Sequence, residues 1–380
     1  KPEIRFAGYT DAWEKRKLGE VFKYKQGQQV PVESQFKTYA PNRHRFIRIV
    51  DITQTNEPIR YINYTGENVI EKTDLFMIRY GQPGIVGYGY SGVIANNLFR
   101  LIPKINIENL FFYYIFETLY PKISSLSSST TMPALSFKTL DVLSMKYPKI
   151  KEQQKIGGFF RQLDNLITVN QRKVDLLKEL KKGFLQKMFP KNGEDKPEIR
   201  FSGFTDAWEK RKMSEMFKIT RGKVLSVDKV SPFSNSEYRY PVYSSQTKNN
   251  GLVGFYNSFL FENAITWTTD GANAGTVNYR PEKFFSTNVN GVLLEKQQRP
   301  NQIIAEALNK VAYRFVSKVG NPKLMNNVMA DIVISVPIDM KEQQQMSDLF
   351  SKLDNLVVVN QRRVDLLKQE KKALLQKMFV

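Results

Sequence analysis

Two long segments of the chain carry apolar residues at the spacing of a coiled-coil heptad. The first runs from Leu163 to Phe189 and the second from Leu353 to Phe379. Residues seven or fourteen apart, such as Ile167 and Val174, repeat along one face of each segment, which predicts two long helices. The seam positions that we expect to pair these helices are Leu163, Asn170, Val174, Leu177, Leu353, Asn360, Val364 and Leu367.

The two segments are also copies of one another, offset by 190 residues. Between residues 152–189 and 342–379, 24 of 38 paired positions are identical. The opening residues 1–22 return as 196–217, where 17 of 22 positions are identical. A match at this level exceeds what a shared helical period produces. The chain therefore consists of two tandem repeats, 1–189 and 196–379, joined by a linker with the proline and glycine expected after a helix stop.

The middles of the repeats differ in sequence but keep one order of elements. Strand-like runs are expected at 75–80 and 94–100 and at 264–268 and 286–292, around a Gly-rich turn, with helices at 109–120 and 301–316. The predicted fold class is α+β, with two mixed domains joined by two long helices in an antiparallel coiled coil. The expected boundaries are 1–150 for the first domain, 151–189 for the first helix, 190–195 for the linker, 196–340 for the second domain and 341–380 for the second helix.

A helix of this length needs a partner helix. About 38 residues span about 57 Å at 1.5 Å per residue, which is more than one small domain covers. The other copy is the expected partner, and the short linker favours an antiparallel pair. Asn170 and Asn360 are predicted to set the register of the pair. Lys181 and Lys371 also lie in the seam, which indicates a weaker far end or contact with another protein.

Composition indicates a globular protein with a polyanionic partner. The chain has 380 residues, of which 41% are hydrophobic, and a formal charge of +20. A basic excess of this size favours nucleic acid, because lysines and arginines gain free energy when they displace counterions from phosphates. There is no cysteine and no apolar run long enough to span a membrane, so we expect a protein of a reducing compartment, the cytoplasm.

Sequence motifs for catalysis are missing. His44 is the only histidine, and it lies in a basic stretch, 41–45, that we interpret as a loop contacting phosphate or bases. The glycines between Gly81 and Gly92 lack the lysine and hydroxyl residue of a phosphate-binding loop and are expected to form a hairpin. No catalytic or metal-binding residue is therefore assigned, and no cofactor is expected in this chain.

At this point the repeated motifs resemble a known family. The opening PEIRFxGxTDAWExRK and the later EQQxxxxxFxxLDNLxxVNQR…LLK…LQKMF, both present twice, resemble the specificity subunit of type I restriction–modification enzymes. The resemblance implies two target recognition domains, an asymmetric bipartite site on double-stranded DNA, and antiparallel conserved helices. It also implies two modification (methyltransferase) subunits that bind S-adenosylmethionine and restriction (translocase/nuclease) subunits that use ATP and Mg²⁺.

Residues that could read DNA are polar side chains on the expected loops of the two domains. For each of them, hydrogen bonding within a turn is an equally weighted interpretation. In the first domain the candidates are Arg43, His44, Arg45, Arg79, Tyr80, Gln82, Asn96, Asn97 and Thr130. In the second domain they are Ser245, Gln246, Thr247, Lys248, Thr268, Thr269, Asp270, Asn273, Asn288, Lys323 and Asn326.

Two other functions remain open from the sequence. One is the recognition part of a single-chain restriction–methylation enzyme, against which the missing catalytic motifs argue. The other is a coiled-coil adaptor whose basic charge has no nucleic-acid partner. The aromatic run 111–114 and the tryptophans Trp13 and Trp208 are interpreted as packing residues rather than base-stacking surfaces.

Overall fold

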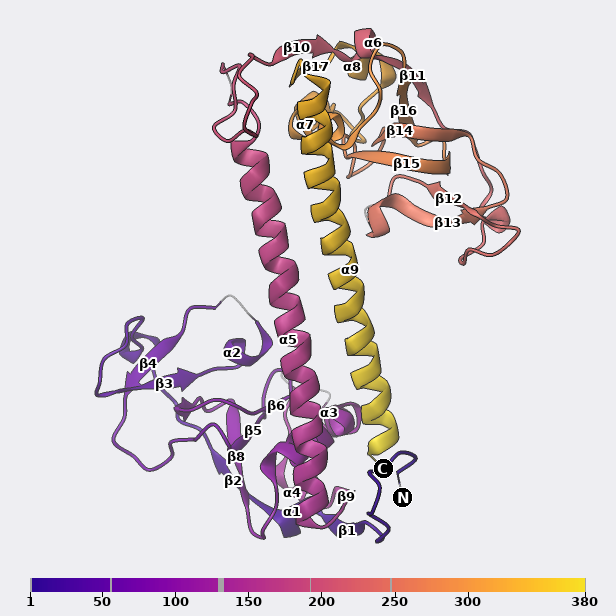
Figure 1. Cartoon of the computed structure of the whole chain (residues 1–380). Coiled ribbons are helices and arrows are strands. Elements are labelled where there is room, and N and C mark those ends of the chain that lie inside the picture. Colours follow the sequence, from indigo (N-terminus) through magenta and orange to yellow (C-terminus); the bar gives the residue numbers. More distant parts are fainter. Residues whose placement is uncertain (1, 55–56, 129–132, 192, 247, 380) are drawn as a thin grey trace. The chain divides into compact units, whose positions relative to one another are not determined.

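The chain folds into two compact units, each built from one domain and parts of both long helices. The computed structural model describes residues 2–54, 57–128, 133–191, 193–246 and 248–379. The first unit contains residues 1–171 and 362–380, and the second contains residues 172–361. Both long helices, which are drawn in Figure 1, contribute residues to each of the two units.

The first unit has mixed α/β structure with three small sheets. The strand orders are β2-β8-β5-β6, β4-β3-β7 and β1-β9. The strands are β1 (Glu14–Lys17), β2 (Phe22–Gln26), β3 (Arg43–Ile47), β4 (Arg60–Asn63), β5 (Leu75–Ile78), β6 (Val86–Gly87), β7 (Val93–Ile94), β8 (Leu98–Pro103) and β9 (Ser144–Tyr147). The helices are α1 (Leu18–Val21), α2 (Val50–Thr53), α3 (Asn109–Ser125), α4 (Phe137–Asp141) and α5 (Ile150–Lys187), of which the residues up to 171 belong to this unit.

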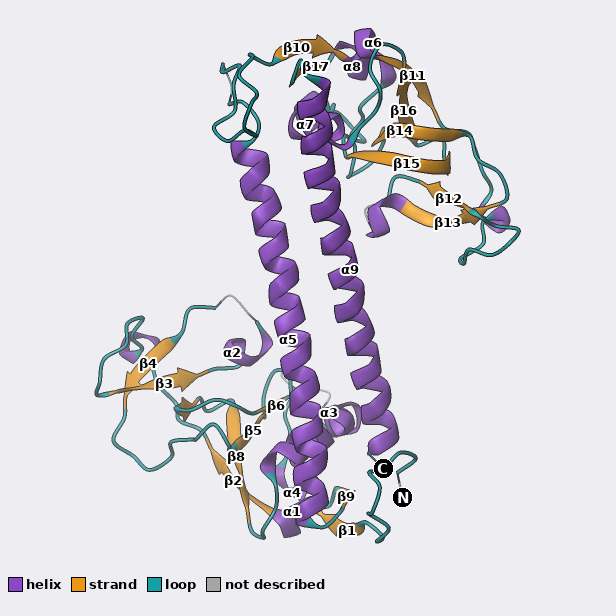
Figure 2. Cartoon of the chain, viewed as in Figure 1, coloured by secondary structure: helices purple, strands orange, loops and turns teal. Residues whose placement is uncertain are grey.

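The second unit has one larger sheet, in the order β11-β16-β14-β15-β12-β13, and the pair β10-β17 (Figure 2). Its strands are β10 (Glu209–Lys212), β11 (Phe217–Arg221), β12 (Tyr240–Tyr243), β13 (Leu252–Tyr256), β14 (Phe261–Thr268), β15 (Val277–Ser286), β16 (Asn290–Glu295) and β17 (Val333–Val336). Its helices are α6 (Met213–Met216), α7 (Gln302–Ala312), α8 (Asn326–Asp331) and the first part of α9 (Met340–Met378). One-turn 3₁₀ helices lie at 32–34, 227–229 and 313–315, and residues 248–251 form a turn with positive φ angles.

Most expected elements are present, with two differences in the strands that carry asparagines. Residues 94–100 and 286–292 are each interrupted by a turn, so that β7 and β8, or β15 and β16, are separate strands. Backbone hydrogen bonds close these turns, from Leu98 to Ala95 at 2.9 Å and from Asn290 to Thr287 at 3.1 Å. The glycine-rich turn does form a hairpin, because β5 and β6 pair in antiparallel fashion.

Within each unit, the segments of α5 and α9 lie antiparallel. In the first unit Asp164 of α5 binds Lys371 of α9 at 2.7 Å, and Phe160 packs against Phe379. Residue numbers therefore increase in opposite directions along the two helices. In the second unit Lys181 of α5 binds Asp354 of α9 at 2.6 Å, the same pair of positions with the two helices exchanged.

The seam residues are buried or half-buried, as the heptad pattern predicted. Val174 and Val364 are fully buried, Leu353 is buried, and Leu163, Leu177 and Leu367 are half-buried. The asparagines Asn170 and Asn360 are also buried, and each donates from Nδ2 to the backbone carbonyl four residues earlier at 2.7 Å. Their proposed role in setting the register stays a prediction.

The seam lysines, expected to mark a weaker end or a contact with another protein, both bind acidic residues of this chain. Lys181 binds Glu306 of α7 as well as Asp354, both at 2.6 Å, and Lys371 binds Glu117 of α3 as well as Asp164. Burial disfavours the charge of Lys181, but the attraction of Glu306 and hydrogen bonds with Asp354 and Glu306 outweigh it, so its pKa lies above the ordinary value. Each lysine ties the helix pair to the adjoining domain.

The opening motif of each repeat binds the start of a long helix through an arginine–glutamate ion pair, which we call the clamp. Arg5 makes a bidentate ion pair with Glu152 at 2.7 and 2.8 Å, and Arg200 makes the same pair with Glu342 at 2.6 and 2.7 Å. Backbone bonds repeat too, since Ile4 donates to Lys377 and Ile199 donates to Lys187. The identity between the repeats therefore preserves contacts that close each unit.

Both domain cores pack against this clamp. Trp13 and Trp208 are buried, and each contacts a phenylalanine that follows a long helix, Phe379 or Phe189. Phe111 and Phe112 of α3 are fully buried. These aromatic residues pack in the core, as predicted from the sequence.

Candidate nucleic-acid interface

Four loops of the second domain meet at one end of its large sheet. The loop after β12 is bonded to the turn before β16, because Thr287 Oγ1 lies 2.9 Å from Ser244 Oγ. Asn273, in the loop between β14 and β15, donates to the carbonyl of Ser245 at 3.4 Å. The loop before α8 joins them through the ion pair between Lys323 and Asp270, at 3.8 Å. Residues far apart in sequence thus form one polar surface.

The sequence candidates of the second domain are mostly found in this loop cluster. Thr269 is buried and donates to the carbonyl of Val289 at 2.8 Å, whereas Gln246 and Asn288 are exposed. Lys248 begins the turn 248–251. Asn326 lies at the start of α8 and donates to the carbonyl of Thr220 at 3.5 Å. Thr247 lies outside the described residues.

The first domain places three of its candidates on a strand. Residues Arg43, His44 and Arg45 belong to β3, which pairs with β4 and β7, so the expected loop at this position was wrong. Strand pairing satisfies the backbone here, and Arg43 stacks on Phe36 with 3.5 Å between the guanidinium carbon and the ring centre. His44 packs edge-on against Tyr64.

Arg45 is also held within the first domain. Its guanidinium lies 3.8 Å from a carboxylate oxygen of Asp51 and 5.1 Å from the ring centre of Tyr90. Asp51 also binds Arg48 at 2.9 Å. The two arginines therefore share one buried carboxylate, which leaves this part of the domain positively charged.

A second group of first-domain candidates gathers at the end of β5. Arg79 donates from Nε to the carbonyl of Leu135 at 3.2 Å and from Nη1 to Gln26 Oε1 at 2.6 Å. The backbone carbonyl of Asn97 accepts from the amide of Arg79 at 2.8 Å, and the carbonyl of the adjacent Asn96 accepts from Gln26. Tyr80 is half-buried and Gln82 is exposed on the following turn. Thr130 lies outside the described residues.

The sequence analysis missed a set of polar residues on the sheet itself. Thr266 on β14, Asn278 and Arg280 on β15, and Asn290 at the start of β16 lie on the same face of the second domain's sheet as Thr268. The signal was present as an alternation, because Ile265 and Trp267, which alternate with the two threonines, face the core. A strand with one apolar and one polar face indicates that the polar face has its own role.

A cluster of metal-ligating side chains and a membrane-spanning helix are both absent from the described part of the chain. Among those residues, no group of three or more histidine, cysteine, aspartate or glutamate side chains is placed to hold a metal ion. No helix among them is both long and apolar enough to cross a membrane. We call the opening motif and the long helix of each repeat its framework. Two similar frameworks that present two unlike polar surfaces, in a chain with a formal charge of +20, define a two-domain recognition protein.

Comparison with known proteins places this chain in a family. Residues 10–179 and 205–369 each match the type I restriction modification DNA specificity domain. The chain therefore belongs to the type I restriction–modification specificity subunit family, with one specificity domain in each repeat.

Individual relatives agree with this assignment. The specificity subunit of the type I restriction enzyme MjaVIII from Methanocaldococcus jannaschii is 20% identical over 395 aligned residues, which cover 96% of this chain and 91% of the relative. The specificity subunit of the MpnII enzyme from Mycoplasma pneumoniae is 33% identical over 157 residues, which cover 40% of this chain and 46% of that protein.

A solved structure has the same fold. The crystal structure of the S subunit of a type I restriction–modification system from M. genitalium superposes with a TM-score of 0.77 at 16% sequence identity, covering 100% of this chain and 99% of that chain. The predicted architecture of two mixed domains and two long helices in tandem repeat is therefore confirmed.

Proposed function

We propose that this chain selects the DNA target of a type I restriction–modification complex. Each domain reads one half of an asymmetric, bipartite sequence in double-stranded DNA, and the two frameworks hold two copies of the methyltransferase subunit together with restriction subunits. The observation that carries this proposal is the contrast between near-identical frameworks and unlike middles. Like frameworks suit two copies of one partner, whereas unlike middles suit two different DNA sequences.

The charge of the chain supports DNA as the ligand. A formal charge of +20 favours counterion release from a phosphate backbone, which supplies affinity without sequence preference. The polar loop clusters in both domains supply the donors and acceptors that base recognition needs. We expect the complex to work in the bacterial cytoplasm, where its DNA substrate is found.

The helices offer each unit the same apolar surface for a partner. Leu166 and Val169 of α5 are exposed in the first unit, and Leu356 and Val359 of α9 are exposed at the equivalent positions of the second. A spacing of three residues puts both side chains of each pair on one helix face. Exposed leucines also repeat on the neighbouring helix, as Leu366 and Leu176. Two copies of one methyltransferase subunit fit these duplicate surfaces.

The chemistry is assigned to the partner subunits. S-adenosylmethionine would be bound by the methyltransferase subunits, and ATP with Mg²⁺ by the restriction subunits. This chain contributes the choice of sequence and the positions of its partners. A single-chain restriction–methylation enzyme would need catalytic motifs in the same polypeptide, and the sequence contains no phosphate-binding loop for a nucleotide.

Sequencing the modified bases of cells tests this function. We expect cells that express this chain with its methyltransferase subunit to carry methylated adenine in one split motif, on both strands, with an unspecified spacer. Cells with the methyltransferase subunit alone are the control. Methylation that does not depend on this chain would contradict the proposal. A coiled-coil adaptor is distinguished by its lack of salt-dependent, sequence-specific DNA binding.

Arg79 provides a test within the first domain. We expect Arg79→Ala to weaken sequence-specific binding by about 1–3 kcal/mol, as for an arginine that reads a base. The melting temperature should also fall, because Arg79 holds Gln26 and the Leu135 carbonyl. Competition between duplexes altered in either half-site measures the loss, with Arg16→Ala in the exposed framework strand β1 as the control. Unchanged discrimination in both halves would remove Arg79 from the interface.

A further inference from the structure

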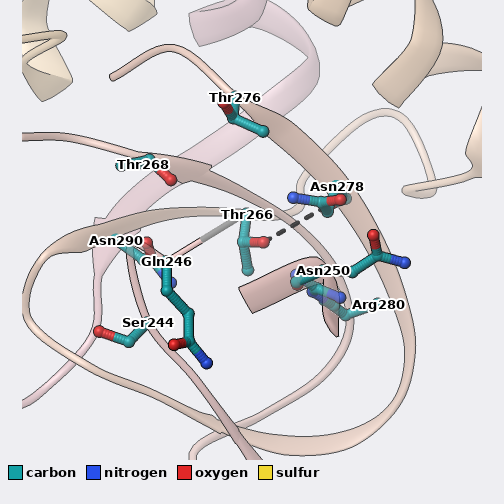
Figure 3. Close-up of a pocket in the computed structure, with 9 residues that line it drawn as sticks. All are labelled: Ser244, Gln246, Asn250, Thr266, Thr268, Thr276, Asn278, Arg280 and Asn290. Carbon is teal, nitrogen blue, oxygen red and sulfur yellow. Dashed lines mark hydrogen bonds between the residues drawn. The ribbon is translucent and has the colours of Figure 1, made fainter. Parts of the chain in front are cut away.

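A polar cavity of about 60 Å³ lies against the sheet of the second domain. Its lining residues come from β14, β15, the start of β16 and the loops after β12 and β14, as Figure 3 shows. All of them carry a side chain that can form hydrogen bonds, and none is acidic. They are Ser244, Gln246, Asn250, Thr266, Thr268, Thr276, Asn278, Arg280 and Asn290. The volume has room for roughly five water molecules.

The cavity has a buried floor and an exposed rim. Thr266, Arg280 and Asn290 on the floor are 2%, 6% and 3% exposed. Gln246 and Asn250, from the loop that follows β12, are exposed at the rim. Because this loop also contributes Ser244 and Ser245 to the loop cluster, the cavity is continuous with the surface proposed to face DNA.

Two atoms of the cavity floor have no hydrogen-bond partner among the described residues. Among the described residues, Arg280 Nε and Asn290 Oδ1 are buried and unsatisfied. Arg280 stacks on Tyr243, with 3.6 Å from its guanidinium carbon to the ring centre, and donates from Nη2 to the Asn250 carbonyl, but it has no ion pair within the described part of the chain. Burial lowers the pKa of Arg280. Glu282 attracts the charge of Arg280 without forming an ion pair with it, so part of the cost of burying this cation is left for the acceptors of a ligand to offset.

The first domain shows that the fold does not need these polar residues. In β5 and β8, Phe76, Ile78 and Leu98 occupy the sheet positions that Thr266, Thr268 and Asn290 occupy in β14 and β16. All three apolar residues are fully buried in the cluster that covers that face. The same sheet position can therefore be filled by hydrocarbon. Polar residues there weaken the domain, so a ligand is the better reason for them.

The loop over the cavity is held in an unusual conformation. Asn249, Asn250 and Gly251 have φ angles of 50°, 52° and 88°, in the left-handed region. A Cβ on Gly251 would lie 2.8 Å from the Ser244 carbonyl oxygen, so this position requires glycine. Successive left-handed residues turn the loop back over the sheet and bring the Asn250 carbonyl to Arg280.

We propose that this cavity is a base-reading pocket, which takes the edge of one base pair in the DNA half that the second domain recognises, with Arg280 as the main donor. This inference rests on the proposed function. A base edge is favoured over a phosphate because the pocket needs both kinds of partner. Arg280 Nε needs an acceptor and Asn290 Oδ1 needs a donor, and a phosphate offers acceptors alone. The major-groove edge of a base pair offers both.

Two substitutions in the full chain, assembled with its methyltransferase subunit, test the pocket. Arg280→Gln removes the cation, and Thr268→Val replaces a floor hydroxyl by a methyl group of similar size. We expect each to reduce discrimination at one base position about 10- to 100-fold. Competition between duplexes that carry the wild-type methylated motif with single-base changes measures this. Arg239→Gln is the matched control, because Arg239 is exposed at the opposite end of β12.

The outcomes separate this inference from the proposed function. We expect Thr268→Val to keep or raise the melting temperature while broadening one half of the motif, which a merely structural threonine would not do. The other half of the motif serves as the internal control. If Arg280→Gln does not fold, Thr268→Val decides the question. A folded Thr268→Val complex with wild-type discrimination in both halves would overturn the pocket, whereas a wild-type complex that selects no sequence would overturn the proposed function.

Discussion

Replacing Arg200 by methionine is expected to destabilise the second unit by about 3–5 kcal/mol, because it leaves a buried carboxylate without its partner. Glu342 is fully buried, and Arg200 binds both of its oxygens at 2.6 and 2.7 Å. Urea unfolding measures the loss. Tryptophan fluorescence can assign it, because Trp208 and Trp267 belong to the second unit and Trp13 to the first.

Three further variants check the reason for this loss. Arg5→Met should weaken the first unit in the same way, because Arg5 makes the equivalent pair with Glu152. Adding Glu342→Leu to Arg200→Met should restore most of the stability, since no charge is then left buried. Arg16→Met, which removes an exposed ion pair, should leave the urea midpoint almost unchanged. Equal losses from Arg16→Met and Arg200→Met would contradict the clamp.

A chimera that carries the variable middle of the second repeat in both repeats is expected to methylate a motif made of two copies of one half-site. The change replaces residues 23–143 by residues 218–332. The ends are structurally equivalent, since Leu18 donates to the Leu143 carbonyl and Met213 to the Ile332 carbonyl. The transplanted middle also brings Glu306, which would take the place of Glu117 beside the seam lysine. Sequencing of modified bases in cells that also express the methyltransferase subunit gives the motif.

The reciprocal chimera is the matched control for this exchange. Placing residues 23–143 in both frameworks should yield two copies of the other half-site. A folded chimera that still methylates the original asymmetric motif would show that specificity lies outside the middles. A chimera that is folded but inactive would show that the middles also contribute to holding the methyltransferase subunit.

The repeat and its long helices could be predicted because they depend on local periodicity. Identical residues at an offset of 190 positions require like structures, and the heptad fixes which face is buried. Val174 and Val364 are accordingly fully buried. The two frameworks are therefore evident in the amino-acid sequence alone, whereas their contacts with the middles are not.

Contacts between distant segments could not be predicted in the same way. Lys181 and Lys371 looked like weak points of the seam because their partners Glu306 and Glu117 lie in the unlike middles, where no repeat draws attention to them. His44 lies on a strand because of its pairing with β4, and neighbouring charges suggested a loop. Polar floor residues such as Thr266 and Arg280 were missed because polar residues were expected to act from loops and not from strands.

The division of both long helices between the units has a consequence for synthesis of the protein. Met378 and Phe379 belong to the core of the first unit, so the ribosome must synthesise the whole second domain before that core can close. Until then, residues 172–189, which are identical to residues 362–379 at 13 of 18 positions, are chemically able to pack against the first domain in their place. The nascent first domain can therefore pair with residues 172–189 before residues 362–379 have been synthesised. Correct assembly requires that this early pairing be reversible.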